Sequence, residues 1–363
     1  MYAASLFLLL IYGQECVGGD MRTWFGTLFL AFFFAAGVQA QSASENVKVG
    51  FLLDSLRVER WQTDVDAFQK RAHELGAETL VENADGNDAL QYEQAKKLLD
   101  AGARVLVVIA HDTNQAGHIV SLANEKHVPV ISYDRLIPNS DIALYVGINY
   151  KEVGRLQAEY LTRLVPKGNF VLLEGSPSDI NAHLLRVGQK EVLQPLIDRG
   201  DVKLLGDFWC TDWNPVEAYR QVATLLTANH GPLDAIVASN DGTATGAVEA
   251  LEENHLAGKV FLSGQDADLA AVLRLLQGTQ AMTIYKPVTS IATQGAEAAV
   301  ALARGQQPNS NGTVPSGNRK IPAILGPIVV VTKHNVMQTV IHDGFQNLDT
   351  IKKSLPPEQW PSH

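Results

Sequence analysis

Short apolar runs alternate with amphipathic stretches over most of this chain, and this alternation restricts its fold more than any other feature. The first apolar runs are rich in β-branched residues and occupy 47–53, 78–84, 105–110 and 128–134. The stretches between them, 60–75, 88–102 and 113–127, carry apolar residues at the i, i+3, i+4 spacing of amphipathic helices. Near-continuously apolar strands that alternate with helices predict a parallel sheet with helices on both faces.

The alternation starts again after "LYVGIN" (144–149), which predicts a second α/β block of about the same size as the first. Its expected strands are 169–175, 202–209, 234–240 and 259–265. Two later apolar runs, 282–287 and 327–332, fit neither block alone. We therefore predict an α/β protein with two doubly wound parallel-sheet domains, joined by a multi-stranded hinge that crosses near 146–150, 284–288 and 325–328.

The domain bounds follow from these crossings. We expect an N-terminal domain of 46–148 plus 288–325, in which a helix at about 288–304 returns to the first block. The C-terminal domain would comprise 149–284 plus 328–345. Turn-forming residues predict a surface loop at 305–320 and a tail at 346–363 that frays at its end.

The N-terminal residues have the pattern of an export signal. From Met21, one basic residue (Arg22) precedes an apolar core of about Phe25 to Val38, and small residues precede Gln41. The apolar core is short for a membrane span of ~20 residues, although a retained anchor stays an alternative. We predict a signal peptide at 21–40 with secretion to the periplasm, and we interpret 1–20 as an extension from an upstream start codon.

Composition and motifs exclude several classes of function. A formal charge of −10 argues against a nucleic-acid partner, which needs a basic face. The two cysteines, Cys16 and Cys210, exclude a disulfide framework and a cysteine-rich metal site. The histidines lack metal-ligand spacing, and neither a phosphate loop nor a nucleophile elbow is present. We expect no enzyme activity, no cofactor and no metal.

Polar and aromatic residues instead gather just after the predicted strands, where open parallel sheets bind ligands. They are Arg60, Trp61, Asp134, Arg135, Asp179, Asn181, Arg186, Trp213, Asn240, Asp241 and Asp266, with Lys286 on a crossing strand. Carboxylates accept from sugar hydroxyls, whereas Arg, Lys and Asn donate to their oxygens. An indole can cover the apolar face of a sugar ring, so two tryptophans could enclose one ring. The set predicts a neutral polyol as ligand.

Each of these residues also has a structural interpretation. A single Arg or Asp at a strand end is more often a helix cap or a surface ion pair, and Asp54 and Asp266 could cap the helices that follow them. Trp213 could pack on the sheet, and Trp209, which ends a strand, is expected to do so. The sugar-site interpretation therefore depends on the whole set of strand ends, not on any one residue.

Several motifs extend the strand-end residues into longer signatures. They are "LRVERWQTD" (56–64), "SYDRLI" (132–137), "GSPSDINAHLLRVGQ" (175–189), "WCTDWNP" (209–215), "VASNDGTATGAVEAL" (237–251), "SGQDADLAAV" (263–272) and "TIYKP" (283–287). Over about 46–345 the chain thereby resembles the type I periplasmic sugar-binding proteins of bacterial ABC importers, and within them the branch that binds D-xylose. Ile180 departs from the polar residue expected between Asp179 and Asn181.

The resemblance implies a function and a set of sugar contacts. The protein would capture a pentose, D-xylose first, by hinge closure and deliver it to the membrane subunits of an ABC permease, acting as a monomer. The alternatives are a sensor that presents sugar to a chemoreceptor or signalling kinase, and binding of a related monosaccharide. A sugar-active enzyme or a DNA-binding regulator is a further alternative. The export signal and the lack of an N-terminal helix-turn-helix disfavour the regulator, and turnover of a sugar by the purified protein would support the enzyme. The implied contacts are Arg60, Trp61, Asp134, Arg135, Asn181, Arg186, Trp213, Asn240, Asp266 and Lys286.

Overall fold

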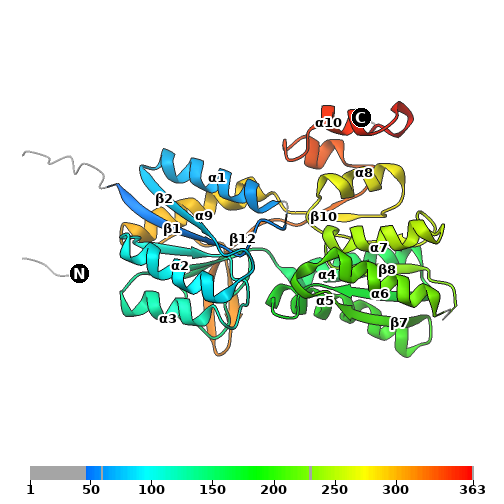
Figure 1. Cartoon of the computed structure of the whole chain (residues 1–363), viewed down its shortest axis with the longest axis horizontal. Helices are drawn as coiled ribbons and strands as arrows, with labels where there is room; N and C mark the ends of the chain where they lie inside the picture. Colours follow the sequence, from blue (N-terminus) through cyan, green and yellow to red (C-terminus); the bar gives the residue numbers. More distant parts are fainter. Residues whose placement is uncertain (1–45, 59, 229–230, 362–363) are drawn as a thin grey trace, which may run out of the picture. The chain divides into compact units, whose positions relative to one another are not determined.

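The computed structural model describes residues 46–58, 60–228 and 231–361 (Figure 1), and these residues belong to one compact unit, Ser44–His363. The predicted signal peptide at 21–40 lies outside the described residues. Within the described part of the chain, no helix is both long enough and apolar enough to cross a membrane.

A seven-stranded sheet forms the first lobe. Its strand order is β11-β12-β5-β4-β3-β1-β2, and all neighbours pair in parallel except β11 and β12. The strands are β1 (Val47–Leu53), β2 (Ala77–Asn83), β3 (Val105–Val108), β4 (Val130–Tyr133), β5 (Leu144–Gly147), β11 (Gly312–Ser316) and β12 (Arg319–Leu325). The helices of this lobe are α1 (Arg60–Glu74), α2 (Asp88–Asp100), α3 (Gly117–Glu125) and α9 (Val288–Ala303).

A four-stranded parallel sheet, in the order β7-β6-β8-β9, forms the second lobe. Its strands are β6 (Gly168–Glu174), β7 (Val202–Trp209), β8 (Ala235–Ala238) and β9 (Phe261–Leu262). Its helices are α4 (Tyr150–Leu164), α5 (Ile180–Asp198), the short η1 (Thr211–Trp213), α6 (Pro215–Thr227), α7 (Asp241–Glu253) and α8 (Leu269–Gln277). The predicted α/β class with two parallel sheets is confirmed.

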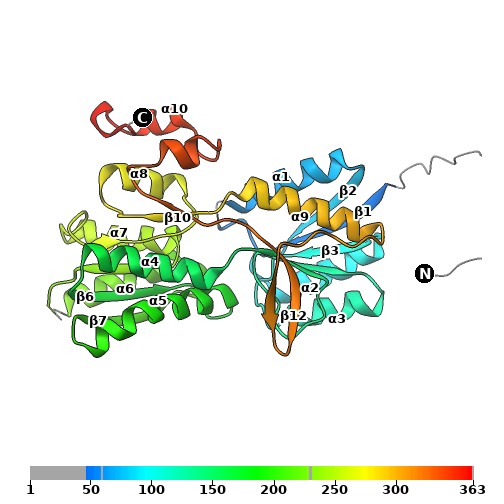
Figure 2. The same cartoon turned by 180° about the vertical axis from the view of Figure 1, so that it is seen from behind.

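The two apolar runs that fitted neither block form a sheet of their own. β10 (Thr283–Tyr285) pairs antiparallel with β13 (Val329–Val331). The chain passes between the lobes after β5, after β10 and after β12 (Figures 1 and 2). These are the three crossings that the sequence predicts. The exact domain bounds stay a prediction.

Strand β1 shows why the first sheet must be covered on both faces. Phe51 packs with Phe68 and Tyr133 on the side of α1 and α9. Leu52, the next residue, belongs to the cluster on the side of α2 and α3. Because successive side chains of a strand point to opposite faces, a continuous apolar run buries both faces of the sheet.

Two glycines let α4 and α5 approach closely at the edge of the second lobe. A Cβ on Gly154 would lie 1.9 Å from the carbonyl oxygen of Leu185, and one on Gly188 would lie 1.9 Å from that of Lys151. A side chain at either position would push the helices apart. This contact fixes the start of α5, which carries Asn181, against the helix that begins at Tyr150.

The structure corrects two sequence expectations. The predicted surface loop at 305–320 contains β11 and the start of β12, which form a hairpin on the edge of the first sheet. The predicted tail at 346–363 contains helix α10 (Leu348–Ser354), which packs beside α8 (Figure 2). Ile351 is fully buried there and Leu355 nearly so, and the Trp360 indole donates to the Leu355 carbonyl oxygen at 3.0 Å.

Candidate functional site

A cavity lies where the carboxyl ends of strands from both lobes meet. It is lined by Val58, Arg60, Trp61, Asp134, Arg135, Tyr150, Asp179, Asn181, Trp213, Asn240, Gln265, Asp266 and Lys286. Nine of the ten predicted contacts are therefore brought together, all except Arg186. The position agrees with the rule that open parallel sheets bind ligands outside the carboxyl ends of their strands.

Arg60, the first residue of α1, links three carboxylates at the base of the cavity. Its guanidinium donates to Asp64 Oδ2 at 2.9 Å and forms an ion pair with Asp134. Its Nε lies 3.5 Å from Asp266 Oδ1, in the loop after β9 of the second lobe. The side chain is 4 % exposed. A planar fork of donors suits a site with several carboxylates better than an ammonium group would.

Asp134 is the carboxylate most densely surrounded by donors. It accepts from Tyr150 Oη at 2.5 Å and from Asn181 Nδ2 at 3.1 Å, besides its ion pair with Arg60. Burial alone would raise the pKa of Asp134, but Arg60 and Lys286 outweigh it and hold the pKa below its usual value. The carboxylate is therefore ionised at neutral pH and can accept hydrogen bonds.

Arg135 is held from both lobes. Its Nη1 donates to Asp54 Oδ2 at 2.9 Å and to the Ala110 carbonyl oxygen at 2.7 Å in the first lobe. Its Nε lies 2.6 Å from Asp179 Oδ2 in the second. Asp54 thus orients the arginine and does not line the cavity. The sequence left open whether Asp54 caps a helix; its carboxylate instead contacts Arg135 and His111.

Asp54 provides a pH-dependent contribution to stability. Burial raises its pKa, but Arg135 and His111 outweigh burial and lower the pKa from 3.8 to about 2. Because folding lowers this pKa, the stabilisation is present above the unfolded value of 3.8 and is lost as the pH falls towards 2. We expect Asp54→Asn to lower the free energy of unfolding by about 2 kcal/mol at pH 7.

Urea unfolding of wild type and Asp54→Asn at a series of pH values measures this contribution. The difference between the two proteins should shrink as the pH falls below 4. Asp100→Asn is the matched control, since Asp100 pairs with Lys126 on the surface and is 68 % exposed. A difference that stayed constant down to pH 2 would contradict the assignment.

In the second lobe, Trp213 lies flat beside the chain at the end of β6. A Cβ on Gly175 would lie 2.2 Å from Trp213 Cη2, so only glycine leaves room for the indole there. Trp213 Nε1 donates to Asp179 Oδ2 at 3.1 Å. Trp213 is the last residue of the short helix η1, which follows β7, and it lines the cavity, which favours the binding interpretation of this residue.

Lys286 and Asn240 complete the polar lining. Lys286 lies on the crossing after β10, and its Nζ is 2.7 Å from Asp266 Oδ1 and 5.4 Å from the Tyr150 ring centroid. Asn240 caps helix α7, because its side chain accepts from Thr243 N at 2.8 Å. Asn240 is therefore a helix cap, one of the structural roles considered for these strand-end residues, and it also lines the cavity.

Three lining residues adopt left-handed backbone conformations that residues other than glycine rarely take. The φ angles are 63° at Asp134, 58° at Trp213 and 105° at Asp266. Such conformations cost about 1–3 kcal/mol each and persist where the surroundings enforce them. Their concentration around one cavity is typical of a functional site.

The cavity also contains buried polar atoms that make no hydrogen bond with any described residue. Two of them, Arg60 Nε and Asp266 Oδ1, lie 3.5 Å apart as an ion pair. The other three are Trp61 Nε1, which is a donor, and Asn181 Oδ1 and Gln265 Oε1, which are acceptors. A buried polar group without a partner costs about 1–3 kcal/mol. A ligand that both donates and accepts would satisfy all three.

The periplasmic binding protein domain family matches residues 49–307, well over half of the chain. This chain belongs to the periplasmic binding protein family. The fold described above is the type I fold of that family.

Two relatives of this periplasmic binding protein are more than 40 % identical to it over most of the chain. The D-xylose-binding periplasmic protein of Escherichia coli is 44 % identical over 302 residues, covering 83 % of this chain and 92 % of the relative. The protein of the same name from Haemophilus influenzae is 42 % identical over 308 residues, covering 85 % and 93 %. Among solved structures, an ABC transporter solute-binding protein from Clostridium phytofermentans with bound β-D-glucose has a TM-score of 0.78 at 27 % identity, covering 84 % of this chain and all of that one.

Arg186 is the one predicted contact that the structure does not bring to the cavity of this binding protein. Its guanidinium donates to Asp207 Oδ2 at 2.7 Å, on β7, and lies 3.8 Å from buried Glu174. Arg186 is five residues after Asn181, which rotates it by roughly 140° around α5. The two side chains therefore point to different sides of the helix.

Sequence reasoning missed Val58, Tyr150 and Gln265 among the lining residues, and it noted Asp179 without choosing it. Gln265 ends the predicted strand 259–265 and Tyr150 directly follows the apolar run 144–149, so attention to strand ends could have found both. Tyr150 instead resembles a core aromatic in sequence, and it is indeed 2 % exposed, but its hydroxyl reaches Asp134. In the described residues, no group of three or more His, Cys, Asp or Glu side chains could hold a metal ion.

Proposed function

We propose that this periplasmic binding protein captures a pentose, most specifically D-xylose, between its lobes and delivers it to an ABC importer. The observation that carries the proposal is the set of unpaired buried atoms in the cavity. Each sugar hydroxyl both donates and accepts, so one polyol can satisfy Trp61 Nε1 together with Asn181 Oδ1 and Gln265 Oε1.

The charges of the site support a neutral ligand. The lining carries three basic side chains, Arg60, Arg135 and Lys286, and three carboxylates, and each basic side chain is paired with one of them, Asp134, Asp179 and Asp266 respectively. No net charge is left for an ionic ligand to neutralise. The names of the two relatives at 42 % and 44 % identity favour D-xylose within the class of neutral sugars.

Hinge closure is the binding mechanism that we infer. Arg135 Nε reaches Asp179, and Asn181 Nδ2 reaches Asp134, so both contacts join the two lobes inside the cavity. A sugar that bridges the same groups favours the closed population over the open one. In this mechanism the three crossings between the lobes bend while each lobe moves as a unit.

Closure also accounts for the affinity that a small sugar needs. A micromolar Kd corresponds to about −8 kcal/mol. Spread over the roughly ten non-hydrogen atoms of a pentose, this is about 0.8 kcal/mol per atom, below the ceiling of about 1.5 for very small ligands. Such efficiency requires a ligand enclosed on all sides, which a closing cleft provides.

We further propose that the protein acts as a monomer in the periplasm and that its closed form is recognised by the membrane subunits of the importer. A chemoreceptor is a second partner that the same closed form could engage. Uptake of labelled xylose in strains with and without the permease tests the transport role. A pull-down that returns only a receptor, together with permease-independent uptake, would indicate sensing instead.

Calorimetry against a panel of pentoses and hexoses tests the ligand. We expect D-xylose to release heat at a one-to-one ratio and to bind more tightly than D-ribose, L-arabinose or D-glucose. If D-xylose gives no heat while another sugar binds tightly, the choice of sugar is wrong. If no monosaccharide binds to folded protein, the proposed function itself fails.

A further inference from the structure

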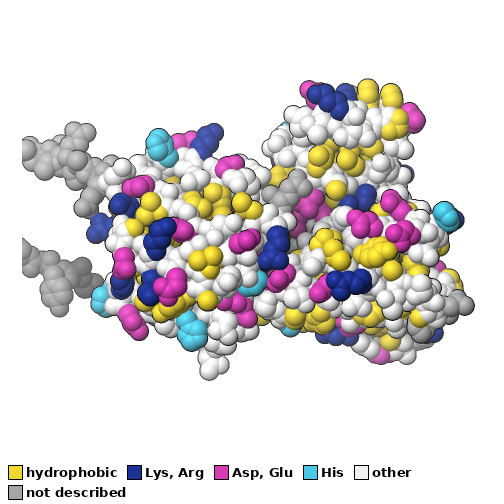
Figure 3. Space-filling model, viewed as in Figure 1, with side chains coloured by type: hydrophobic (Ala, Val, Ile, Leu, Met, Phe, Trp, Pro, Cys, Tyr) yellow, Lys and Arg dark blue, Asp and Glu magenta, His cyan; other side chains and the backbone are white. Residues whose placement is uncertain are grey.

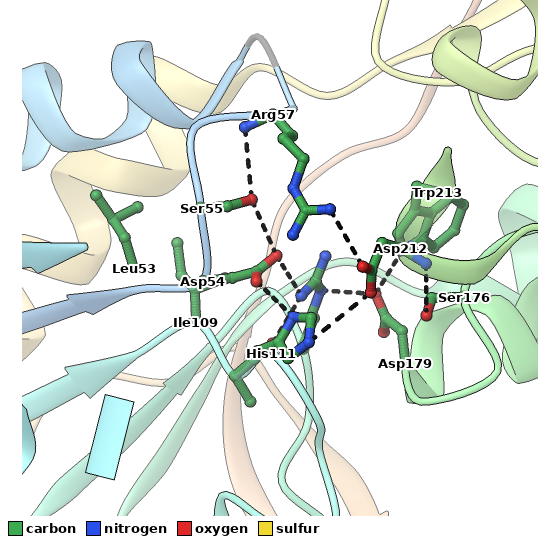
Figure 4. Close-up of polar contacts among 12 residues, drawn as sticks. Leu53, Asp54, Ser55, Arg57, Ile109, His111, Ser176, Asp179, Asp212 and Trp213 are labelled. Carbon is green, nitrogen blue, oxygen red and sulfur yellow. Dashed lines mark hydrogen bonds and ion pairs between the residues drawn. The ribbon is translucent and has the colours of Figure 1, made fainter. Parts of the chain in front are cut away.

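A second set of contacts joins the two lobes at the rim of the cleft, outside the cavity. Arg57 Nη1, in the loop after β1, lies 3.2 Å from Asp212 Oδ2 in η1 of the second lobe. His111 Nε2, after β3, lies 3.8 Å from Asp212 Oδ1. Figure 4 shows Arg57 and His111 of the first lobe both directed at the Asp212 carboxylate of the second lobe. These two contacts join the lobes outside the sugar cavity.

These residues are separate from the sugar-contact set. Arg57, His111 and Asp212 do not line the cavity described above. Their side chains are 47 %, 14 % and 33 % exposed, whereas Arg60, Lys286 and Asp266 in the cavity are at most 4 % exposed. Figure 3 shows basic and acidic side chains next to each other where the two lobes meet on this face.

Asp212 is held in place by its own lobe. Its backbone is left-handed, with φ at 53°, and its N–H donates to Ser176 Oγ at 3.2 Å. It directly precedes Trp213, which lines the cavity. The second lobe therefore fixes the backbone that carries this carboxylate.

His111 is held in place in the same way by the first lobe. Its Nδ1 lies 2.7 Å from Asp54 Oδ1, which turns Nε2 towards Asp212. Asp54 also accepts from Arg135 of the cavity. In the first lobe, Asp54 connects His111 to Arg135 of the sugar site. In the second lobe, Asp212 is connected to the sugar site because it is the neighbour of Trp213 in the chain.

A neutral contact supports the same loop. Thr113, two residues after His111, donates from its backbone N–H and from its hydroxyl to the Ser178 carbonyl oxygen, each at 3.2 Å. The loop after β3 thereby contacts the second lobe at two separate points. Both contacts must break when the cleft opens.

We propose that Arg57, His111 and Asp212 form a latch that holds the lobes closed and slows the release of the ligand without contacting it. This inference rests on the proposed function for the identity of the ligand as a sugar. The latch residues are positioning residues, because they act on the closed state through the relative position of the lobes.

The charges around His111 give the latch a dependence on pH. The carboxylates of Asp54, Asp88 and Asp212 and the guanidiniums of Arg57 and Arg135 surround the ring. The hydrogen bond to Asp54 raises the pKa of His111 above 6.5, against the effect of burial, and Asp88 and Asp212 raise it further. Of these carboxylates only Asp212 lies across the cleft, so closure favours the protonated ring. Sugar affinity should therefore fall as the pH rises through this pKa.

Release of D-xylose, followed by stopped-flow tryptophan fluorescence, tests the latch. The variants are Arg57→Gln, Asp212→Asn and the double variant, in which Asn keeps the left-handed backbone accessible at 212. We expect each single variant to raise koff about two- to fivefold with little change in kon. The double variant should release sugar no faster than Asp212→Asn alone, because both changes remove the same pair.

Asp100→Asn is the matched control, since Asp100 pairs with Lys126 on the surface of the first lobe alone. It should leave koff unchanged. His111→Gln should remove the pH dependence of koff between about pH 6 and 8. An unchanged koff in Arg57→Gln and Asp212→Asn, or fully additive effects in the double variant, would overturn the latch.

A second measurement needs no sugar and so separates the latch from the proposed function. Spin labels on the exposed faces of α2 and α6 report the separation of the lobes in the sugar-free protein. The latch predicts a larger share of the longer separation in Asp212→Asn than in wild type and in Asp100→Asn. Equal distributions in the three proteins would overturn the latch whatever the ligand proves to be.

Discussion

Arg60→Met is expected to abolish tight sugar binding and to destabilise the folded protein. The substitution keeps an unbranched apolar stem but leaves Asp64, Asp134 and Asp266 without their shared guanidinium. Removing one partner of a buried, hydrogen-bonded charge pair costs about 2–5 kcal/mol in binding. We therefore expect Kd to rise roughly 30- to 5,000-fold, which calorimetry with D-xylose measures.

The same substitution should lower the free energy of unfolding by about 3–5 kcal/mol, because three buried carboxylates lose the guanidinium that they share. Arg60→Lys separates the two effects: an ammonium keeps the charge but cannot reach three carboxylates with a planar fork. We expect Arg60→Lys to fold with near wild-type stability and still to bind weakly.

Arg186→Met is the matched control for Arg60→Met, since Arg186 pairs with Asp207 outside the cavity. It should leave the Kd for sugar nearly unchanged. Loss of binding in Arg186→Met, with wild-type binding in Arg60→Lys, would contradict this description of the site.

Trp213→Ala is expected to weaken sugar binding by about 1–3 kcal/mol while the thermal unfolding of the sugar-free protein changes little. The indole presents a flat apolar face to the cavity and lies on Gly175. Alanine removes that face but keeps a Cβ, so the strain of the left-handed backbone at 213 stays the same. Asp179 loses one donor but retains its contacts with Arg135 and with the Asn181 N–H.

Trp209→Ala is the control for this prediction. Trp209 ends β7 and packs against His183, with ring centroids 4.7 Å apart, and it does not line the cavity. Its replacement should affect stability more than binding. A large fall in the Tm of sugar-free Trp213→Ala would assign Trp213 to structure instead.

The sequence predicts most of the fold because buried parallel strands leave a strong local signal. β1 and β7 have the predicted bounds, and helix α1 differs by one residue. The hairpin of β11 and β12 leaves no such signal. Its residues include Pro315 and Gly317, which are typical of turns, and its only partner in the sheet, β5, is far away in the sequence. Pro is tolerated in an edge strand such as β11.

The sequence predicts a site residue well when its place directly after a strand brings it to the cavity. It predicts a site residue less well when the direction of the side chain determines whether it reaches the cavity. The residues directly after a strand reach the cavity because strand ends meet there. Arg186 is inside a helix, where its direction depends on the rotation from Asn181, and Asp207 offers it a partner on the other side. The opposite case is Arg57, whose partner Asp212 belongs to the other lobe and leaves no trace in the local sequence.

Cys210 has a practical consequence for observing this protein in solution. It is fully buried at the end of β7, and burial raises the pKa of its thiol to about 12, with Glu217 and Glu174 adding to the effect. Buried thiols of this kind react slowly with maleimides and iodoacetamides. In a chain that begins at Gln41 and so lacks Cys16, a cysteine introduced at the exposed position Leu56 would therefore take up an environment-sensitive dye selectively. The labelled protein would convert the opening and closing of its lobes into an optical signal for sugar.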